Sequence, residues 1–251
     1  VWSRSWQVNI DFNDESFYGS FYIYSDEGIV TKFAADSMKT GTFSIFSNET
    51  GCSTTGTWEQ RRKSVSYRVD ALPQYKIFIN EPDDIYPIGT LGQVISAAQQ
   101  LPASCDGSVV FAVVVDKPGK VTMTLDCPPL NINNGEDVTI TSDVQANINN
   151  LITWDGDDNF GNPVSSGTNI IVDIDFLNSL TNLPLYDVEG NNKGFKVDVV
   201  YPYPDPLPPE GTKLRVFWDD TNLSTWGGFN NSVTGCLYPS SLPVVTGCHN
   251  W

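Results

Sequence analysis

Alternation of apolar and polar side chains with a period of two constrains the fold of this chain more than any other feature. It is clearest over residues 170–176, where one face is apolar and the other is mostly acidic. The apolar positions are Ile170, Val172, Ile174 and Phe176. Because successive side chains of a strand point to opposite faces of a sheet, this pattern predicts a strand with one buried face.

A second apolar segment, which ends with Ile152 and Trp154, precedes this strand. The residues between the two segments are rich in Asp, Gly and Asn, which favour turns. The sequence therefore predicts a β-hairpin over residues 152–176, with Trp154 packed over it as a large apolar plug.

The same alternation predicts further strands along the whole chain. They lie near residues 6–12, 17–24, 43–45, 65–71, 75–79, 109–115, 121–127, 138–140, 197–199 and 214–216. A second hairpin is predicted at residues 117–120, with Val115 opposite Val121. Many short strands separated by turn-forming residues are typical of β-sandwiches.

Residues 90–101 depart from this pattern. Leu91, Val94, Ile95 and Ala98 recur at helical spacing and predict one short helix. We therefore predict an all-β fold with two immunoglobulin-like β-sandwich domains in tandem, over residues 1–87 and 88–220, with this helix linking them. Residues 221–251 are expected to form a loop-rich, cysteine-containing segment that leads into further chain.

Acidic residues outnumber basic ones by 30 to 14, which gives a formal net charge of −16. A field of this sign repels phosphate backbones and anionic lipid, so nucleic-acid binding is not expected. The excess acid is interpreted as a solvated surface that resists self-association, and divalent-cation binding is the alternative. No apolar run approaches the ~18 residues of a membrane helix, so membrane insertion is not expected.

Five cysteines are too few for a disulfide scaffold and lack the spacing of a zinc site. Cys236 and Cys248 bracket a proline-containing loop and each follows a Thr-Gly pair, so they are the predicted disulfide, worth roughly 3 kcal/mol in the chain-entropy model. In the hairpin predicted at 117–120, Cys127 lies about 13 Å along the strand from the level of Cys105, too far for a bond. A bond from Cys52 to Cys105 is an alternative, and one cysteine is left over.

The chain carries few residues suited to catalysis. Its only histidine is His249, and it has no Gly-x-Ser-x-Gly elbow, no His-Glu-x-x-His pair and no phosphate-binding loop. Asp173 with Asp175 and Asp219 with Asp220 are nominal glycosidase pairs, but solvent-facing acids are the favoured explanation. The sequence therefore predicts a protein that is not an enzyme.

A calcium site is the one cofactor hypothesis that the sequence raises. Asp155, Asp157 and Asn159 have the spacing of a calcium loop, but Phe160 occupies the position where an EF-hand needs glycine. Turn-forming acids explain this run better, and calcium here or at residues 80–84 is the less favoured hypothesis.

Several segments resemble a known group of proteins. Residues 152–168 resemble the Trp-Asp-Gly hairpin of FlgD-like immunoglobulin-type domains. The segments LNSLTNLPLYDVEGNNKGFKVDVVYP (177–202), FWDDTNL (217–223) and TGCHNW (246–251) resemble a recurring part of very large type IX-secreted surface proteins of gliding bacteria, whose relatives include the mobile gliding adhesins. The resemblance covers residues 88–251, and the first 85 residues carry no matching motif.

This resemblance implies an extracellular, cell-surface location and a structural or adhesive role within a long adhesin or filament. The implied partners are other domains or copies of the same large protein and an outer-membrane secretion or anchoring protein. Since residues 1–4 do not form a signal peptide, the chain is expected to be a segment of a longer protein. Asp36-Ser37-Met38 matches the O-glycosylation pattern of this bacterial group, which makes Ser37 a candidate site.

The aromatic residues of the first domain support a second hypothesis. Tyr22, Tyr24 and Trp58 are candidates for binding surface polysaccharide, and the chain would then be a carbohydrate-binding accessory region of a secreted polysaccharide-degrading enzyme. Aromatic residues are common in strands as core and cross-strand neighbours, and that explanation is favoured. Retention on polysaccharide that falls when these three residues are replaced by alanine separates the two hypotheses.

Overall fold

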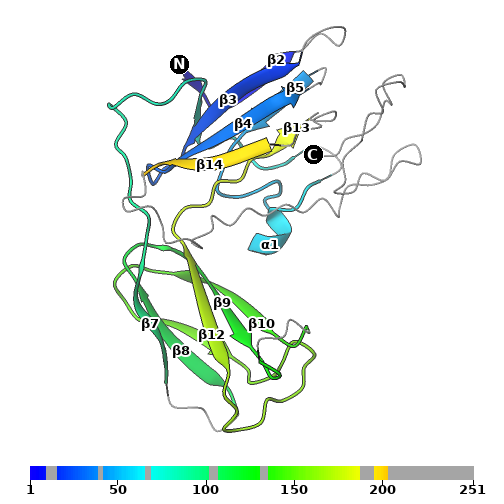
Figure 1. Cartoon of the computed structure of the whole chain (residues 1–251), viewed down its shortest axis with the longest axis vertical. Helices are drawn as coiled ribbons and strands as arrows, with labels where there is room; N and C mark the ends of the chain where they lie inside the picture. Colours follow the sequence, from blue (N-terminus) through cyan, green and yellow to red (C-terminus); the bar gives the residue numbers. More distant parts are fainter. Residues whose placement is uncertain are drawn as a thin grey trace, which may run out of the picture. The chain divides into compact units, whose positions relative to one another are not determined.

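The structure is a computed structural model of the chain. It describes residues 1–9, 16–38, 42–65, 69–101, 107–130, 135–186 and 195–202, in which nearly all of the regular secondary structure is β-strand. The chain divides into two compact units. Among the described residues, unit 1 comprises Val1–Thr90 and the chain from Leu180 to Pro202, and unit 2 comprises Leu91–Ser179. Unit 2 is therefore inserted into the chain of unit 1 (Figure 1).

Unit 1 contains two antiparallel sheets (Figure 1). The first has five strands in the order β1 (Trp2–Ser3), β6 (Lys76–Phe78), β3 (Phe17–Tyr24), β4 (Val30–Met38) and β14 (Phe195–Tyr201). The second has three strands in the order β13 (Leu185–Tyr186), β5 (Thr42–Phe46) and β2 (Ser5–Asn9). The one helix in the described part of the chain is α1 (Trp58–Arg61), which begins with a capping box between Thr57 and Gln60.

Strand β3 confirms the alternation predicted for residues 17–24. Phe21 and Ile23 are buried, whereas Tyr22 and Tyr24 lie on the opposite face. The chain then turns at Gly28, whose φ of 77° favours glycine, and returns as β4. The sequence analysis did not predict β4, because small residues such as Ala34 blur its alternation.

Both sheets of unit 1 contribute side chains to one apolar core. The buried members are Phe21, Ile23, Phe33, Ala35, Met38, Phe43, Ile45, Tyr75 and Ile77. They come from β3, β4, β5 and β6 and from the residue before β6, so the two sheets face each other across this core. The hydroxyl of Tyr75 donates a hydrogen bond to the carbonyl oxygen of Leu180 at 3.0 Å, which joins the late part of the chain to the early part.

Unit 2 contains two three-stranded antiparallel sheets. One has the order β11 (Asn150–Trp154), β8 (Val109–Val115) and β7 (Val94–Gln100). The other has the order β10 (Val138–Val144), β9 (Gly119–Asp126) and β12 (Ile171–Leu177). Their shared core is formed by Phe111, Val113, Val115, Val121, Met123, Leu125, Cys127, Val144, Ile152 and Trp154.

The two hairpins predicted in this region are wrong, although their strands are present. Strands β8 and β9 lie in different sheets, and so do β11 and β12. Phe111 pairs with Ile152, and Met123 pairs with Ile174, so each predicted hairpin instead crosses from one sheet to the other. Alternation places the core-facing side chains correctly in both cases, but it does not distinguish paired strands from strands that face each other across a core.

The helix predicted over residues 90–101 is also wrong, because residues 94–100 form β7, which pairs with β8. The register of this pair shifts between Val94 and Ser96 and again between Ser96 and Gln99. Such irregularities break the period of two, which explains the helix-like spacing. A strand was also predicted over residues 65–71. Residues 65 and 69–71 do not form a strand, and the other three lie outside the described residues.

The predicted second domain, residues 88–220, differs from unit 2 at its far end. Strand β14 was expected in that domain, but it pairs with β4 in unit 1, from Phe195 opposite Ala35 to Tyr201 opposite Val30. The strand predicted at 214–216 and the segment 221–251 lie outside the described residues. In the part of the chain that the structure describes, no helix is long and apolar enough to cross a membrane.

Candidate functional site

Two of the predicted glycan-binding residues, Tyr22 and Tyr24, lie on the face of the five-stranded sheet that points away from the core of unit 1, which we call the outer face. Strand register places two rows of side chains across it. One row consists of Trp2, Phe78, Tyr22, Lys32 and Asp198. The other consists of Lys76, Tyr24, Val30 and Tyr201. The sheet thus brings aromatic and cationic side chains together from five strands.

Two lysines lie over aromatic rings of the outer face. The Nζ atom of Lys32 is 5.6 Å from the centre of the Tyr22 ring. The Nζ atom of Lys76 is 5.5 Å from the centre of the Trp2 ring and 5.7 Å from that of Tyr24. These distances are those of cation–π contacts, which hold each ammonium group against the aromatic surface.

The segment after β6 covers part of the outer face. The Tyr86 ring lies 4.9 Å from that of Phe78 and 5.6 Å from that of Tyr24, both in edge-on geometry. The Tyr24 hydroxyl donates a hydrogen bond to the Pro87 carbonyl oxygen, and the Tyr201 hydroxyl bonds to the Glu81 carboxylate. Burial, and then the neighbouring Tyr86, raise the pKa of Tyr24. Tyr24 therefore holds this segment in place and offers little free ring surface.

Trp58, the third predicted glycan-binding residue, is in a different setting. It is the first residue of α1, and the guanidinium carbon of Arg62 lies 4.2 Å from the centre of its ring. Tyr22 and Tyr24 lie two residues apart on the same strand, β3, whereas Trp58 belongs to no strand. Sequence reasoning missed Trp2, Lys32 and Lys76. The turn at Gly28 could have predicted that β4 returns beside β3 and brings Lys32 next to Tyr22. Trp2 and Lys76 reach this face only through the pairing of strands that are far apart in the sequence.

Two of the five cysteines, Cys52 and Cys127, lie in the part of the chain that the structure describes. Cys52 and Cys127 are free thiols, and Cys127 is buried in the core of unit 2. Burial raises the pKa of Cys52 to about 11, so its thiol stays protonated at neutral pH and is a poor nucleophile. The predicted disulfide between Cys236 and Cys248 lies outside the described residues, and so does Cys105.

The candidate calcium loop after β11 uses its acids to hold its own turn. The Asp158 carboxylate accepts hydrogen bonds from the backbone N–H groups of Phe160 and Asn162, both at 2.8 Å, and from the Asn162 amide. These bonds, with those of Asn162 largest, lower the pKa of Asp158. Asp155 likewise accepts from the N–H of Asp157 at 3.1 Å. Among the described residues, no three His, Cys, Asp or Glu side chains are grouped to hold a metal ion.

The candidate O-glycosylation residue, Ser37, belongs to β4, and its side chain is not among those described. Its neighbours have opposite environments, since Asp36 is exposed and Met38 is fully buried. Regular alternation from Phe33 and Ala35 would place Met38 on the outer face, but the register of β3 and β4 shifts between Phe17 and Gly19, and Met38 belongs to the core of unit 1.

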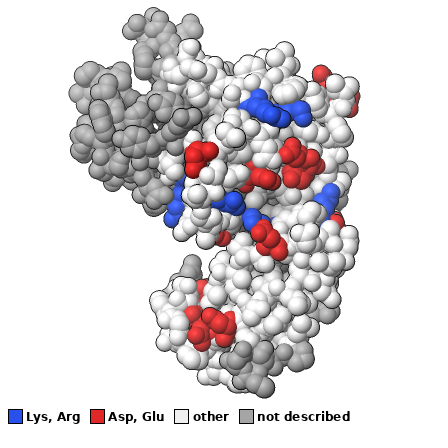
Figure 2. Space-filling model, turned by 180° about the vertical axis from the view of Figure 1, so that it is seen from behind, with Lys and Arg blue, Asp and Glu red and all other residues white. Residues whose placement is uncertain are grey.

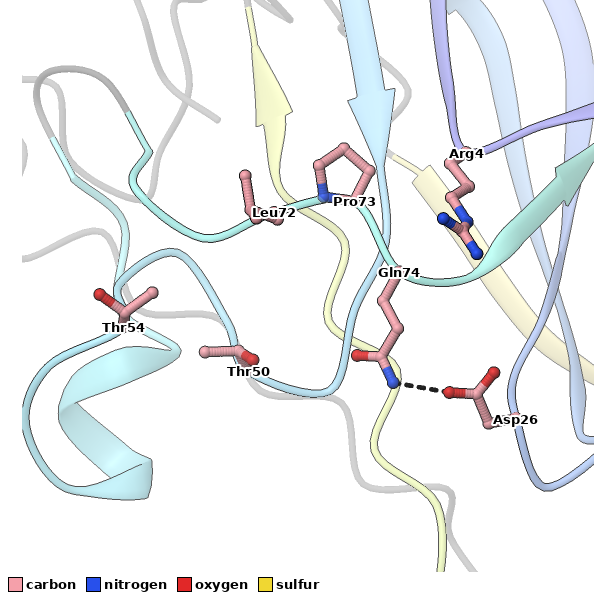
Figure 3. Close-up of a pocket in the computed structure, with 7 residues that line it drawn as sticks. All are labelled: Arg4, Asp26, Thr50, Thr54, Leu72, Pro73 and Gln74. Carbon is pink, nitrogen blue, oxygen red and sulfur yellow. Dashed lines mark hydrogen bonds between the residues drawn. The ribbon is translucent and has the colours of Figure 1, made fainter.

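Unit 1 also has a shallow hollow of about 400 Å³ between the N-terminal strand and the chain before β6 (Figure 3). It is lined by Arg4, Asp26, Thr50, Thr54, Leu72, Pro73 and Gln74. The Gln74 amide donates a hydrogen bond to Asp26 at 2.7 Å across it.

Charged groups form no single large patch on the face seen in Figure 2, where small groups of both signs lie among wider uncharged areas. Comparison with protein-family models, with curated proteins and with solved structures finds no match to the chain. The outer face of unit 1 is therefore identified from its own geometry as the best candidate site.

Proposed function

We propose that the chain is a non-enzymatic segment of a secreted cell-surface adhesin or filament. The observation that carries this proposal is the construction of the described chain from two compact units, each with its own core between two antiparallel sheets. We infer that both units are β-sandwiches of the immunoglobulin type, an architecture that uses loops and sheet faces for binding.

The antiparallel sheets support the proposed structural role. Antiparallel ladders join β3 to β4 and β4 to β14 along most of their lengths, so a pull on this sheet is shared among many backbone hydrogen bonds. A module of this kind holds a binding surface away from the cell. The resemblance of residues 88–251 to segments of large type IX-secreted proteins of gliding bacteria supports an extracellular location.

The proposed partners are other domains or copies of the same large protein and an outer-membrane protein that secretes or anchors it. Surface polysaccharide is the proposed ligand class for adhesion. No cofactor is part of this proposal, and calcium at the Asp155 loop is a less favoured addition. The net charge of −16 disfavours nucleic acid as a partner.

A second candidate function is a carbohydrate-binding accessory region of a secreted polysaccharide-degrading enzyme. The aromatic and cationic rows of the outer face support it. The two functions differ in the protein that contains the segment, because only the second places a catalytic domain in the same chain.

Antibodies raised against residues 1–251 test the proposal on cells that produce the protein. We expect them to label intact, unpermeabilised cells and to capture a very large chain whose peptides contain no glycosidase or lyase domain. Capture of a chain with such a catalytic domain would establish the second function instead. Labelling that requires permeabilised cells would contradict both.

A further inference from the structure

We propose that the outer face of unit 1 binds an acidic polysaccharide through the rings of Trp2 and Tyr22 and the ammonium groups of Lys32 and Lys76. This inference rests on the proposed adhesive function and names the chemistry of the ligand. It keeps Tyr22 of the sequence hypothesis, leaves out Tyr24 and Trp58, and adds Trp2 of β1 and both lysines.

The aromatic part of the site is a row across three strands. Trp2 pairs with Phe78, and Phe78 pairs with Tyr22, so two strand spacings separate the two outer rings by about 10 Å. Phe78 is buried between them beneath Tyr86, whereas Trp2 is 44% exposed and Tyr22 is partly exposed. Two sugar rings of one polysaccharide chain can therefore stack on the two outer rings, one on Trp2 and one on Tyr22.

The lysines supply the charge that selects an acidic ligand. Within the described residues, no carboxylate forms an ion pair with Lys32 or Lys76. The neighbouring Lys196 does form one, with Asp198 at 3.2 Å. In a chain with a net charge of −16, two cations that face solvent beside aromatic rings and lack a carboxylate partner are suited to an external anion.

The acids near this face do not cancel that attraction. Asp198 lies directly opposite Lys32 in the register of β14 and β4, but its carboxylate is 3.2 Å from the Nζ atom of Lys196, whose charge offsets it. The Glu81 carboxylate accepts a hydrogen bond from the Tyr201 hydroxyl. Asp36 lies on the same strand as Lys32 but four residues away, about 13 Å along it. That separation exceeds the screening length of about 8 Å at physiological ionic strength, so more distant acids of the chain act weakly here.

The test measures binding of the full chain, residues 1–251, to four polymers by fluorescence titration at physiological ionic strength. Alginate and dextran sulfate carry sugar rings and either carboxylate or sulfate groups, dextran carries sugar rings without charge, and poly-L-glutamate carries charge without sugars. We expect at least one of the two acidic polysaccharides to bind at least about fivefold more tightly than both dextran and poly-L-glutamate. A preference between alginate and dextran sulfate identifies the anionic group.

Substitutions then locate the site. Lys32→Gln and Lys76→Gln are each expected to weaken binding by about two- to fivefold, and Trp2→Ala by about fivefold. Lys117→Gln, in the turn between β8 and β9 of unit 2, removes the same charge and is expected to change nothing. Circular dichroism of each variant confirms that the fold is retained, as the exposure of Trp2 predicts.

Three results would overturn the inference. They are no binding of either acidic polysaccharide, binding of poly-L-glutamate as tight as that of the acidic polysaccharides, or a loss of affinity in Lys117→Gln as large as that in Lys32→Gln and Lys76→Gln. None of them depends on where the protein is located in the cell. The inference can therefore fail while intact-cell labelling still supports an adhesive segment with another ligand, and it can hold while that labelling fails.

Discussion

Trp154 fixes the end of strand β11 in unit 2. Its side chain is 5% exposed within the core, and its Nε1 atom donates a hydrogen bond to the Asp157 carbonyl oxygen at 2.8 Å. We expect Trp154→Ala to lower the free energy of unfolding of unit 2 by about 3–5 kcal/mol, because it leaves a cavity. Trp154→Phe retains a buried ring but loses the bond, and is expected to cost about 1–3 kcal/mol. Urea unfolding followed by circular dichroism measures both.

The exposed Trp2 is the matched control for this experiment, and we expect Trp2→Ala to leave the unfolding of unit 2 unchanged. If Trp154→Ala cost no more than Trp154→Phe, the buried area of the indole would not be its main contribution.

Asp158 makes the turn after Trp154 sensitive to acid. Hydrogen bonds from Asn162 and Phe160 hold the pKa of its carboxyl below the ordinary value of 3.8. Because the folded pKa is the lower one, the carboxylate stabilises the turn fully above pH 3.8, and this stabilisation is lost as the pH falls through the folded value. In an NMR titration, we expect the Asn162 amide signal to move with a midpoint below 3.8.

Asp158→Asn is the control for this titration, because it removes the ionisable group and is expected to abolish the movement. A midpoint at or above 3.8 would contradict the role assigned to the hydrogen bonds. The sequence analysis favoured turn formation over calcium for this run of acids, and the hydrogen bonds of Asp158 are consistent with that choice. The sequence did not indicate that Asp158, rather than Asp155 or Asp157, accepts most of the hydrogen bonds within this turn, because the acceptor depends on the loop conformation.

Strands of this protein were predictable where a single alternating face meets a core, as in β3 and β12. The failures have a common cause at the level of elements. A strand such as β8, whose side chains are mostly apolar, has the same pattern whether its neighbour is hydrogen-bonded beside it or packed across from it. Bulges in β7 shifted its apolar residues to helical spacing. Local pattern therefore locates the strands better than it pairs them.

Tyr86 provides two aromatic contacts for the segment after β6 that covers part of the outer face of unit 1. Its ring packs on Phe78 and Tyr24, and each aromatic pair of this kind contributes about 0.5–1.5 kcal/mol beyond its buried area. We expect Tyr86→Ala to destabilise unit 1 by about 1–3 kcal/mol and to speed proteolysis within residues 81–88. Limited digestion followed by mass spectrometry measures the cleavage rate there.

Ile85→Ala is the matched control, because the neighbouring Ile85 side chain is 80% exposed and its loss should leave the cleavage rate unchanged. Equal acceleration by both variants would mean that the segment is held by its backbone rather than by the Tyr86 ring.

The order of the two units along the chain depends on long-range pairing. The sequence analysis places two domains in tandem, whereas unit 1 resumes at Leu180 and ends its described part with β14 beside β4. The alternation in residues 195–201 predicts a strand, but it contains no information about its partner more than 150 residues earlier. The same limit explains why Tyr22 and Tyr24 were found as neighbours whereas Trp2 and Lys76 were not.

An inserted unit with its own core is expected to fold by itself. The two ends of unit 2 lie close together, since the Gly92 N–H donates a hydrogen bond to the Asn178 side-chain oxygen at 2.8 Å. We expect residues 91–179 alone to unfold cooperatively on heating. Replacing them with a short glycine linker is expected to leave unit 1 folded, because closing a short flexible loop costs little free energy. Circular dichroism with temperature tests both chains.

Core substitutions in the full chain make this prediction sharper. Ile23 is buried only in the core of unit 1, and Met123 only in that of unit 2, and each alanine substitution there is expected to cost about 2–5 kcal/mol. If the units fold independently, calorimetry resolves two unfolding transitions. Ile23→Ala then lowers the midpoint temperature of the unit 1 transition alone, and Met123→Ala lowers that of the unit 2 transition alone. If both substitutions shifted a single transition, the inserted unit would depend on its host for stability, and the isolated residues 91–179 would then be expected to unfold.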